Sequence, residues 1–317
     1  MSKRILSLIA ALCLFLSVGS VAASAEDAAP QSAVSHRYDP ALQAEAADAP
    51  AIGSRVAYVA DPATGKVLYE KNAHEAVYPA STTKLLTALL VVENCDLSEM
   101  ATVSREALRR VPSDYVDADL EVGERLSVLD LLKALLIPSA NDVAFVLAEH
   151  VSGTTEAFVA RMNERAAELG CESVHFVNPN GIHNAEHVCS AYDLFLIARE
   201  CRKHEVLREI VQTKSFTLPA TEQHPEEDRT FLNSNEMLLL GPYYYSYCTG
   251  MKTGRTDAAG ECLVASSERD GMELISVVLG GRIVDGVTER FIDTRSLLDF
   301  AYENYAFQTV ASLGDTA

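Results

Sequence analysis

Tryptophan is absent from the sequence and basic residues are scarce: 26 Lys and Arg stand against 45 Asp and Glu in 317 residues, a formal net charge of -19. The missing tryptophan excludes nothing by itself. The shortage of basic residues argues against nucleic acid as a partner, because proteins that bind the phosphate backbone need a clustered basic face. The sequence also has no C-x-x-C pair, so a zinc knuckle or a thioredoxin-like redox site has no support.

The composition is nevertheless that of a folded protein. Hydrophobic residues make up 48% of the chain and charged residues 22%, close to the proportions found in globular domains. Disorder of the whole chain is therefore excluded. The length suits one large domain or two lobes that share a cleft.

The first 25 residues have the layout of a secretory signal peptide. Lys3 and Arg4 give a short positive start, residues 5–18 form an almost uninterrupted apolar run, and small residues occupy positions 23–25. We predict cleavage after residue 25 and export of the remainder. An uncleaved membrane anchor is the alternative.

Three further regions follow the predicted cleavage site. Residues 26–50 are rich in Ala, Asp, Glu and Pro without an apolar period, which is typical of a flexible linker. One domain is expected over residues 51–310, and residues 311–317 are expected to form a tail.

Six of the seven cysteines remain after cleavage, since Cys13 lies in the signal peptide. An even number in an exported chain allows three disulfides, whose pairing the sequence does not fix. Buried free thiols are the other possibility, because cysteine is a common core residue. The six are Cys95, Cys171, Cys189, Cys201, Cys248 and Cys262.

Apolar periodicity and turn residues predict an α+β domain. Strands are expected at 55–60, 66–71, 243–253, 261–268 and 272–280, and helices at 82–93, 126–137, 142–150, 155–169, from 190 onward, and at 290–305. This order favours an antiparallel five-stranded sheet flanked by helices, with a helical lobe inserted at roughly 95–240.

The start of the helix at 82–93 carries a candidate nucleophile. Ser81 and Lys84 are three residues apart, so they share one face of the helix one turn apart. Serine is a weak nucleophile without a base, and a lysine can be that base only if burial or a neighbouring cation keeps its amine neutral. Taken alone, the pair could equally be a serine helix cap followed by a surface lysine.

Two later motifs favour the interpretation of Ser81 and Lys84 as a catalytic pair. Ser139-Ala140-Asn141 lies on a predicted turn between two apolar helices, where a hydroxyl and an amide can project into a cleft. Lys252-Thr253-Gly254 ends a predicted strand, where an ammonium and a hydroxyl can bind a carboxylate and glycine lets the backbone approach it. Each alone could be a helix cap or a turn. The order S-x-x-K, S-x-N and K-T-G is what carries the argument.

At these residues the sequence resembles the penicillin-recognising serine enzymes, and within them the D-alanyl-D-alanine carboxypeptidases, the low-molecular-mass penicillin-binding proteins. The resemblance runs over about 55–307 and includes residues 176–181, 252–260 and 280–282. It implies a β-lactamase/transpeptidase-like fold and a hydrolase that removes the terminal D-alanine of peptidoglycan stem peptides through an acyl-enzyme. It implies no metal and no cofactor.

The resemblance also assigns roles. It implies Ser81, Lys84 and Ser139 as catalytic residues, and Asn141, Lys252, Thr253, Gly254, Arg255 and Arg290 as substrate-binding residues. The backbone N–H groups of Ser81 and Arg255 would form the oxyanion hole. The expected partners are the stem peptide ending in D-Ala-D-Ala and β-lactam antibiotics as covalent inhibitors. An extracytoplasmic protein is expected, on the cell-wall side of the membrane or secreted, with no stable anchor after cleavage.

Several alternatives stay open. A DD-endopeptidase or DD-transpeptidase shares the fold and the acylation step, and a non-catalytic wall-binding or antibiotic-binding protein shares the fold alone. A class A β-lactamase would need an E-x-x-L-N stretch, which the sequence lacks. A zinc peptidase could use the H-x-x-E-H pattern of His183 and His187, but the pattern requires a helix, and the segment is expected to be a loop.

Overall fold

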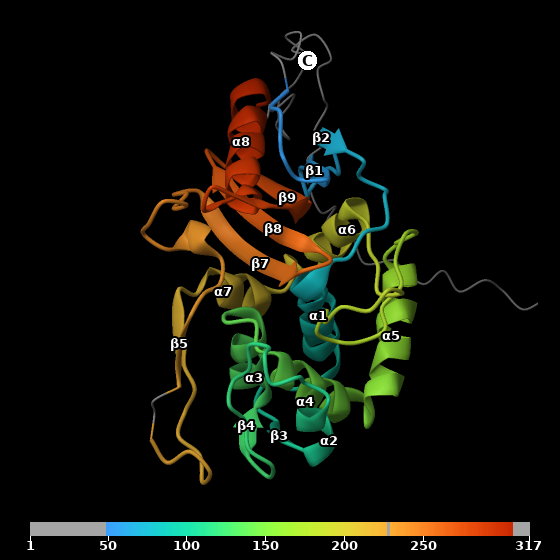
Figure 1. Cartoon of the computed structure of the whole chain (residues 1–317), viewed down its shortest axis with the longest axis vertical. Coiled ribbons are helices and arrows are strands. Elements are labelled where there is room, and N and C mark those ends of the chain that lie inside the picture. The colour runs from blue at the N-terminus through green and yellow to red at the C-terminus, as the bar shows by residue number, and fades with distance from the viewer. Residues whose placement is uncertain (1–48, 227–228, 307–317) are drawn as a thin grey trace, which may run out of the picture. The chain divides into compact units, whose positions relative to one another are not determined.

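The computed structural model describes residues 49–226 and 229–306. Nearly all of the predicted signal peptide and linker, and the predicted tail, lie outside the described residues. The described chain contains a five-stranded antiparallel sheet with the strand order β2-β1-β9-β8-β7 (Figure 1). Its strands are β1 (Val56–Ala60), β2 (Val67–Lys71), β7 (Cys248–Thr256), β8 (Gly260–Arg269) and β9 (Met272–Gly281).

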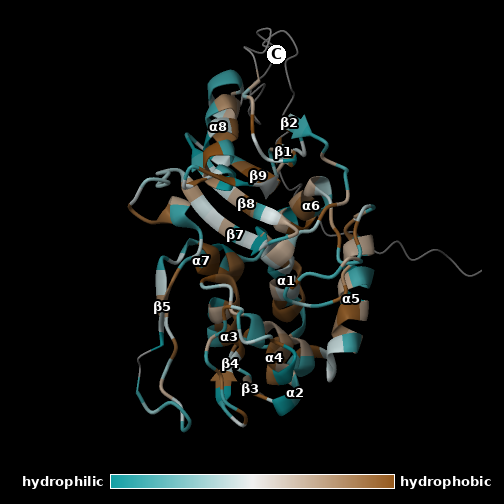
Figure 2. Ribbon diagram, in the orientation of Figure 1, coloured by the Kyte–Doolittle hydropathy of each residue, from teal (hydrophilic) through white to brown (hydrophobic). Residues whose placement is uncertain are grey.

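Strand β1 shows how the sheet is buried on both faces. Val56 and Tyr58 belong to one apolar cluster, and Ala57 and Val59 belong to another. Successive side chains of a strand point to opposite faces, so two layers of helices must cover the sheet. One face packs on α8 (Glu289–Asn304), whose hydropathy alternates between apolar and polar residues (Figure 2). The other face packs on α6 (Ala191–Cys201) and α1 (Lys84–Asn94).

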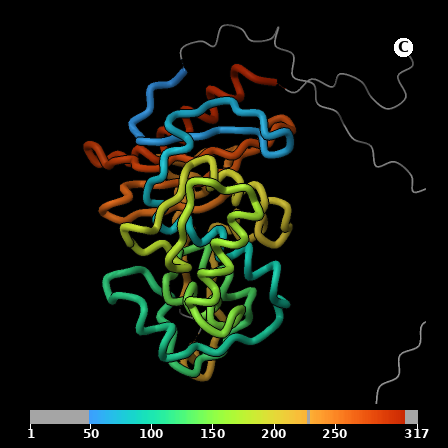
Figure 3. Tube along the Cα trace, turned by 90° about the vertical axis from the view of Figure 1, so that its right-hand side faces the viewer, coloured from blue at the N-terminus to red at the C-terminus, as the bar shows by residue number. Residues whose placement is uncertain are grey.

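The middle of the chain forms the helical lobe. Figure 3 shows the blue and cyan start of the described chain among its orange and red end, while green and yellow residues form the other region. The remaining elements are η2 (Ala80–Thr83), β3 (Met100–Thr102), α2 (Arg105–Arg109), β4 (Arg125–Ser127), α3 (Val128–Leu136), α4 (Asn141–Ser152), α5 (Thr155–Glu168), α7 (Glu205–Gln212), β5 (Ser215–Thr217), β6 (Thr230–Leu232), η3 (Glu236–Leu238), β10 (Ile283–Val284) and β11 (Val287–Thr288).

The predicted elements agree with this architecture except at one strand. The strand expected at 243–253 begins at Cys248 and runs on to Thr256. The tyrosines before it pack on α8 instead: the Tyr243 ring lies 4.7 Å from the Phe291 ring, and the Tyr245 hydroxyl donates to Asp299 at 2.8 Å. Tertiary contacts therefore override the strand propensity of this aromatic run.

The cysteines of the described residues are free thiols, so the three-disulfide possibility is not realised there. Cys189, Cys201 and Cys262 are buried. Burial raises the pKa of Cys262 to about 11, which keeps this thiol protonated and unreactive at neutral pH. Among the described helices, none is both long and apolar enough to span a bilayer.

Candidate active site

Ser81 lies in the short 3-10 turn η2 that leads into α1. Two neighbouring hydroxyls fold back onto this turn: Thr82 Oγ1 donates to the Pro79 carbonyl at 2.7 Å, and Thr83 Oγ1 donates to the Ala80 carbonyl at 2.8 Å. Ala80 has a positive φ of 49°. The turn is thus fixed by its own side chains, which hold the Ser81 hydroxyl at the start of the buried helix.

Lys84 is fully buried one turn after Ser81. Its Nζ lies 3.0 Å from Oγ of Ser81, 2.9 Å from Oδ1 of Asn141 and 2.7 Å from the carbonyl oxygen of Asn180. The predicted nucleophile, the predicted base and the amide of the second motif therefore meet at one nitrogen atom.

The partners of Lys84 fix which way its amine faces. Asn141 Nδ2 donates to the Val116 carbonyl at 2.8 Å, so Oδ1 is the atom turned toward Lys84. Oδ1 of Asn141 and the Asn180 carbonyl can only accept hydrogen bonds. A neutral amine that donates to both has its lone pair left for the Ser81 hydroxyl. This is the geometry required of a general base.

The electrostatics favour that neutral amine. Burial holds the pKa of Lys84 well below its usual range, the nearby Lys252 lowers it further, and Asp142 acts in the opposite direction. Desolvation disfavours the charged form of an amine, which favours Lys84 as a proton acceptor.

Asn180 belongs to residues 176–181, which carry part of the family resemblance, but the sequence predicts no role for it. Its carbonyl reaches Lys84 because the next residue, Gly181, packs closely against η2, the nucleophile turn that carries Ser81. Gly181 has a φ of +84°, and a Cβ built there would lie 1.9 Å from the Ala80 carbonyl oxygen. Only glycine fits this close approach between two backbones. The Pro179-Asn180-Gly181 sequence indicates a turn here. It does not indicate the contact with Lys84, because every residue type has a backbone carbonyl.

The second motif lies where it was expected, between α3 and α4. Ser139 has a positive φ of 77°, and its hydroxyl has no hydrogen-bond partner in the part of the chain that the structure describes. Asp142, which sequence reasoning missed, directly follows this motif and binds the backbone of a neighbouring loop. It accepts the backbone N–H groups of Ala118 at 3.0 Å and Leu120 at 3.4 Å, and burial raises its pKa to about 6.

The third motif lies on β7, the edge strand next to the nucleophile turn. A Cβ built on Gly254 would lie 3.0 Å from both the Pro79 carbonyl oxygen and the Ser81 backbone nitrogen. The glycine therefore lets the strand pass close to Ser81, whereas the sequence analysis expected it to let the backbone approach a bound carboxylate. Because β7 is an edge strand, the backbone N–H groups on its outer side have no strand partner and can bind a ligand.

Lys252 and Thr253 complete this strand end. Lys252 is fully buried, and its Nζ donates to the Thr253 carbonyl at 3.1 Å. Burial, and next the charge of Arg290, lower the pKa of Lys252 to about 7. The Thr253 hydroxyl is 2.7 Å from the hydroxyl of Ser234, another residue that sequence reasoning missed.

The two arginines occupy different positions around β7. Arg290 Nη1 donates to the Gly254 carbonyl at 3.2 Å and lies 2.5 Å from Oε2 of Glu261. Arg255 Nε lies 3.3 Å from Oε1 of the same glutamate, with its side chain 63% exposed. Arg290 thus braces the backbone of the third motif and adds positive charge near Lys252, while Glu261 engages both guanidinium groups.

The histidines of the H-x-x-E-H pattern lie in a loop, as expected. The Val177 N–H donates to Nδ1 of His187 at 3.2 Å, so Nε2 carries the proton that it shares with Thr83 Oγ1 at 2.8 Å. Burial lowers the pKa of His187 to about 3. With both ring nitrogens engaged, His187 is a structural residue beneath the nucleophile turn, which argues against the zinc-peptidase alternative.

Known proteins are similar to this chain in sequence. A family described as D-alanyl-D-alanine carboxypeptidase (peptidase S11) matches residues 43–282. The carboxypeptidase DacF of Bacillus subtilis (strain 168) is 35% identical over 247 residues, which are 76% of this chain and 60% of the relative. DacC of Escherichia coli (strain K12), also a D-alanyl-D-alanine carboxypeptidase by name, is 33% identical over 276 residues, 84% of this chain and 65% of the relative.

Solved structures agree with the family match. The crystal structure of the Streptomyces K15 DD-transpeptidase is 30% identical, with a TM-score of 0.75, and the match covers 81% of this chain and 100% of that one. The expected β-lactamase/transpeptidase-like fold is thereby confirmed. The chain spans about 60 to 65% of the length of the two curated relatives above.

Proposed function

Since the chain belongs to the D-alanyl-D-alanine carboxypeptidase family, peptidase S11, we propose that it is a serine-type carboxypeptidase that removes the terminal D-alanine of peptidoglycan stem peptides. The observation that carries the proposal is the position of the buried Lys84 amine. It donates to two groups that can only accept hydrogen bonds, and it also lies against the Ser81 hydroxyl. Its substrate is a stem peptide ending in D-Ala-D-Ala, and β-lactams acylate the same serine.

In the acylation step, Ser81 Oγ attacks the carbonyl carbon between the last two D-alanines and its proton passes to Lys84 Nζ. The oxyanion is stabilised by the backbone N–H groups of Ser81 and Arg255, which the close approach at Gly254 supports. Ser139 relays the proton to the leaving amine, free D-alanine departs, and water then hydrolyses the ester, with Ser81 regaining its proton.

Substrate orientation is the task of the second and third motifs. Lys252 and Thr253 bind the terminal carboxylate through charge-assisted and hydroxyl hydrogen bonds. Asn141 holds the peptide amide. Gly254 lets β7 lie close to Ser81, and Arg290 contributes positive charge while bracing the strand.

Location follows the family, whose penicillin-binding proteins act outside the cytoplasm. We propose that this chain is exported by the sequence predicted at residues 1–25 and works on the cell-wall side of the membrane or as a secreted protein.

A DD-transpeptidase is the second candidate function. The Streptomyces sp. (strain K15) relative is named a D-alanyl-D-alanine carboxypeptidase, whereas its solved structure is titled a DD-transpeptidase. The difference is whether water or an amine accepts the acyl group. Incubation of the chain with a D-Ala-D-Ala peptide and increasing glycine decides it: stoichiometric D-alanine release with hydrolysed peptide supports the carboxypeptidase, and predominant glycine-capped peptide supports the transpeptidase. No release of D-alanine contradicts both.

Lys252→Ala is expected to lower kcat/KM for a peptide with a free terminal carboxylate by roughly 10- to 150-fold, the loss of one charge-assisted hydrogen bond of about 1.5 to 3 kcal/mol. The amidated peptide should lose far less. Lys252→Met, which fills the buried space without charge, controls for cavity effects, and Lys203→Ala is a matched exposed control. An equal loss on acid and amide would remove Lys252 from the carboxylate site.

The pH dependence of kcat/KM has a predicted basic limb near pH 7. The pKa of Lys252 is lowered to about 7, so this residue loses its charge, and its hold on the carboxylate, as pH rises through that value. The bound carboxylate stabilises the protonated form, which moves the same limb to higher pH in the kcat profile. Stopped-flow or steady-state profiles with Lys252→Arg, which stays charged, should lack the limb; its persistence would assign it to another group.

A further inference from the structure

A hollow of about 430 Å³ is lined by residues that precede the nucleophile turn in the chain and by residues that follow the third motif. Tyr78, three residues before Ser81, lies on one wall, and residues 257–260, which follow the third motif, form another. Cys262 Sγ lies 3.8 Å from the Tyr78 carbonyl oxygen, and Cys262 pairs with Gly254 in the sheet register. The nucleophile turn and β7, which meet at Ser81, therefore continue into segments that line this hollow.

The direction of β7 shows which part of a substrate reaches it. Under the proposed function, the terminal carboxylate lies at Lys252 and the scissile carbonyl lies by Gly254 and Arg255. Residues upstream in the stem peptide then run toward Thr256 and Asp257, at about 3.3 Å per residue for an extended chain. The third residue of the stem, next to the penultimate D-alanine, arrives at the end of β7, with the hollow beside it.

The charged groups on the walls are of both signs. Arg55 and Arg282 supply guanidinium groups, and Asp257 supplies an exposed carboxylate. Arg282 uses Nε and Nη2 on Glu289, at 3.2 and 2.7 Å, which leaves the Nη1 donors for a ligand. Val188 and Ala259 add apolar side chains to the lining, and Tyr78 adds an aromatic ring.

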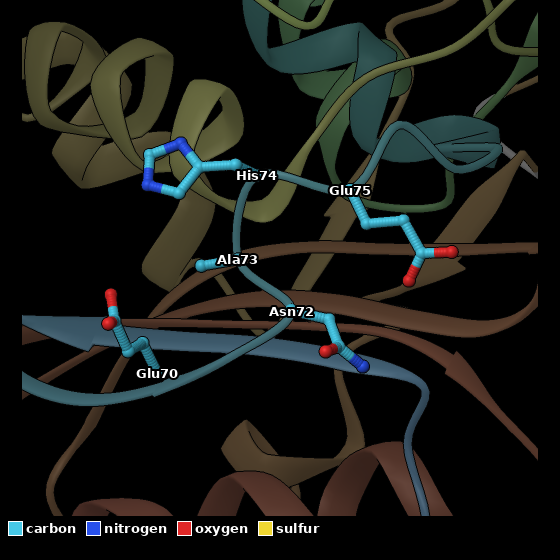
Figure 4. Close-up of a pocket in the computed structure, with 5 residues that line it drawn as sticks. All are labelled: Glu70, Asn72, Ala73, His74 and Glu75. Carbon is cyan, nitrogen blue, oxygen red and sulfur yellow. The ribbon is translucent and has the colours of Figure 1, made fainter.

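Both arginines are held in place from outside the hollow. Glu289 pairs with Arg282, and Glu75 pairs with Arg55, yet neither glutamate lines the hollow. Figure 4 shows Glu75 in a neighbouring pocket, with its side chain pointing away from that of His74. The charged groups that face a ligand in the hollow are therefore two guanidinium groups and one carboxylate.

We infer that this hollow binds the side chain of the third stem residue, and that it selects a side chain with a methylene stem that ends in both an ammonium and a carboxylate. Asp257 receives the ammonium, Arg282 and Arg55 receive the carboxylate, and Tyr78 and Val188 cover the methylenes. A side chain that ends in an amine alone engages Asp257 but gives the guanidinium donors no acceptor. This inference rests on the proposed carboxypeptidase function and assigns the amino acid that the enzyme prefers in the cell wall.

The test compares three pentapeptides that differ only in the third residue: meso-diaminopimelate, L-lysine or L-norleucine, each followed by D-Ala-D-Ala. D-Alanine release gives kcat/KM for each. The expected order places diaminopimelate about tenfold or more above lysine, with lysine close to norleucine, and the difference lies in KM because the groups are remote from the reacting carbonyl.

Two variants assign the preference to the hollow. Arg282→Gln should remove most of the advantage of diaminopimelate over lysine, and Asp257→Asn should lower kcat/KM for diaminopimelate, while both leave the norleucine peptide unchanged. Arg109→Gln, an exposed arginine on α2 paired with Glu106, is the matched control and should change nothing.

Equal kcat/KM on the three peptides, or a preference for lysine, overturns the inference and leaves the carboxypeptidase function standing. A diaminopimelate preference that survives both variants also overturns it, because the selecting groups then lie elsewhere. Absence of D-alanine release from all three peptides overturns the proposed function and the inference with it.

Discussion

Ser81→Ala is expected to abolish D-alanine release, with kcat falling by on the order of 10⁴-fold or more, as in serine hydrolases that lose their nucleophile. The same change should abolish covalent capture of penicillin, because both reactions need Oγ to form the acyl bond. Turnover assays and gel or mass detection of the penicillin adduct measure the two effects separately.

The variant should fold normally. The hydroxyl of Ser81 contacts Lys84, whereas the turn itself is held by Thr82 and Thr83. The thermal unfolding midpoint should therefore stay close to that of the parent chain. Ser98→Ala, in an exposed loop, is the matched control and should retain full activity. Penicillin labelling that survives in Ser81→Ala would move the nucleophile to another residue.

Lys84→Arg is expected to lower the rate of acylation by about 10²- to 10⁴-fold, the usual contribution of a general base. A guanidinium stays protonated at all accessible pH values, so it cannot take the proton of Ser81. Single-turnover acylation by a chromogenic β-lactam isolates this step from hydrolysis.

Lys84→Met separates chemistry from folding. Its side chain fills a similar space without a buried amine, so activity should fall as far as in Lys84→Arg while stability stays similar or rises. A Lys84→Arg variant that acylates at the parent rate would show that Lys84 acts only through its charge. Another group would then have to accept the proton.

Much of the fold could be predicted because its core elements carry strong local patterns. The strands expected at 55–60 and 66–71 pair as the β1–β2 hairpin, and Asp61 organises the turn between them by accepting the Ala63 N–H at 2.7 Å. A helix was expected from residue 190 onward, and Ser190 caps α6 there by accepting the Asp193 N–H. Strands β3 to β6 were missed because they are three residues long, too short for any period to show.

The candidate site, like the fold, could be predicted from the sequence only in part. Ser81, Lys84 and Asn141 could be proposed because their chemistry lies in the side chain, and the structure brings them together at the Lys84 amine. Asn180 and Val116 contribute backbone carbonyls, which any residue type supplies. Their part depends on long-range packing, above all on the glycine contact behind the nucleophile turn, and no local pattern encodes it.

Arg290 shows a third kind of limit. Its place at the start of the last helix agrees with the helix expected at 290–305, but its pairing with Glu261 and its hydrogen bond to the Gly254 carbonyl depend on how α8 packs against the sheet. The guanidinium therefore lies behind the third motif, where it lowers the pKa of Lys252.

The central claim is that Ser81, activated by the neutral amine of Lys84, forms an acyl-enzyme. Intact-protein mass spectrometry after brief incubation with penicillin, followed by peptide mapping, tests it most directly. The account predicts one adduct per chain, with the mass of the whole antibiotic, on the peptide that contains Ser81, and slower formation in Lys84→Arg. An adduct on any other residue, or no adduct in a folded chain, would contradict it.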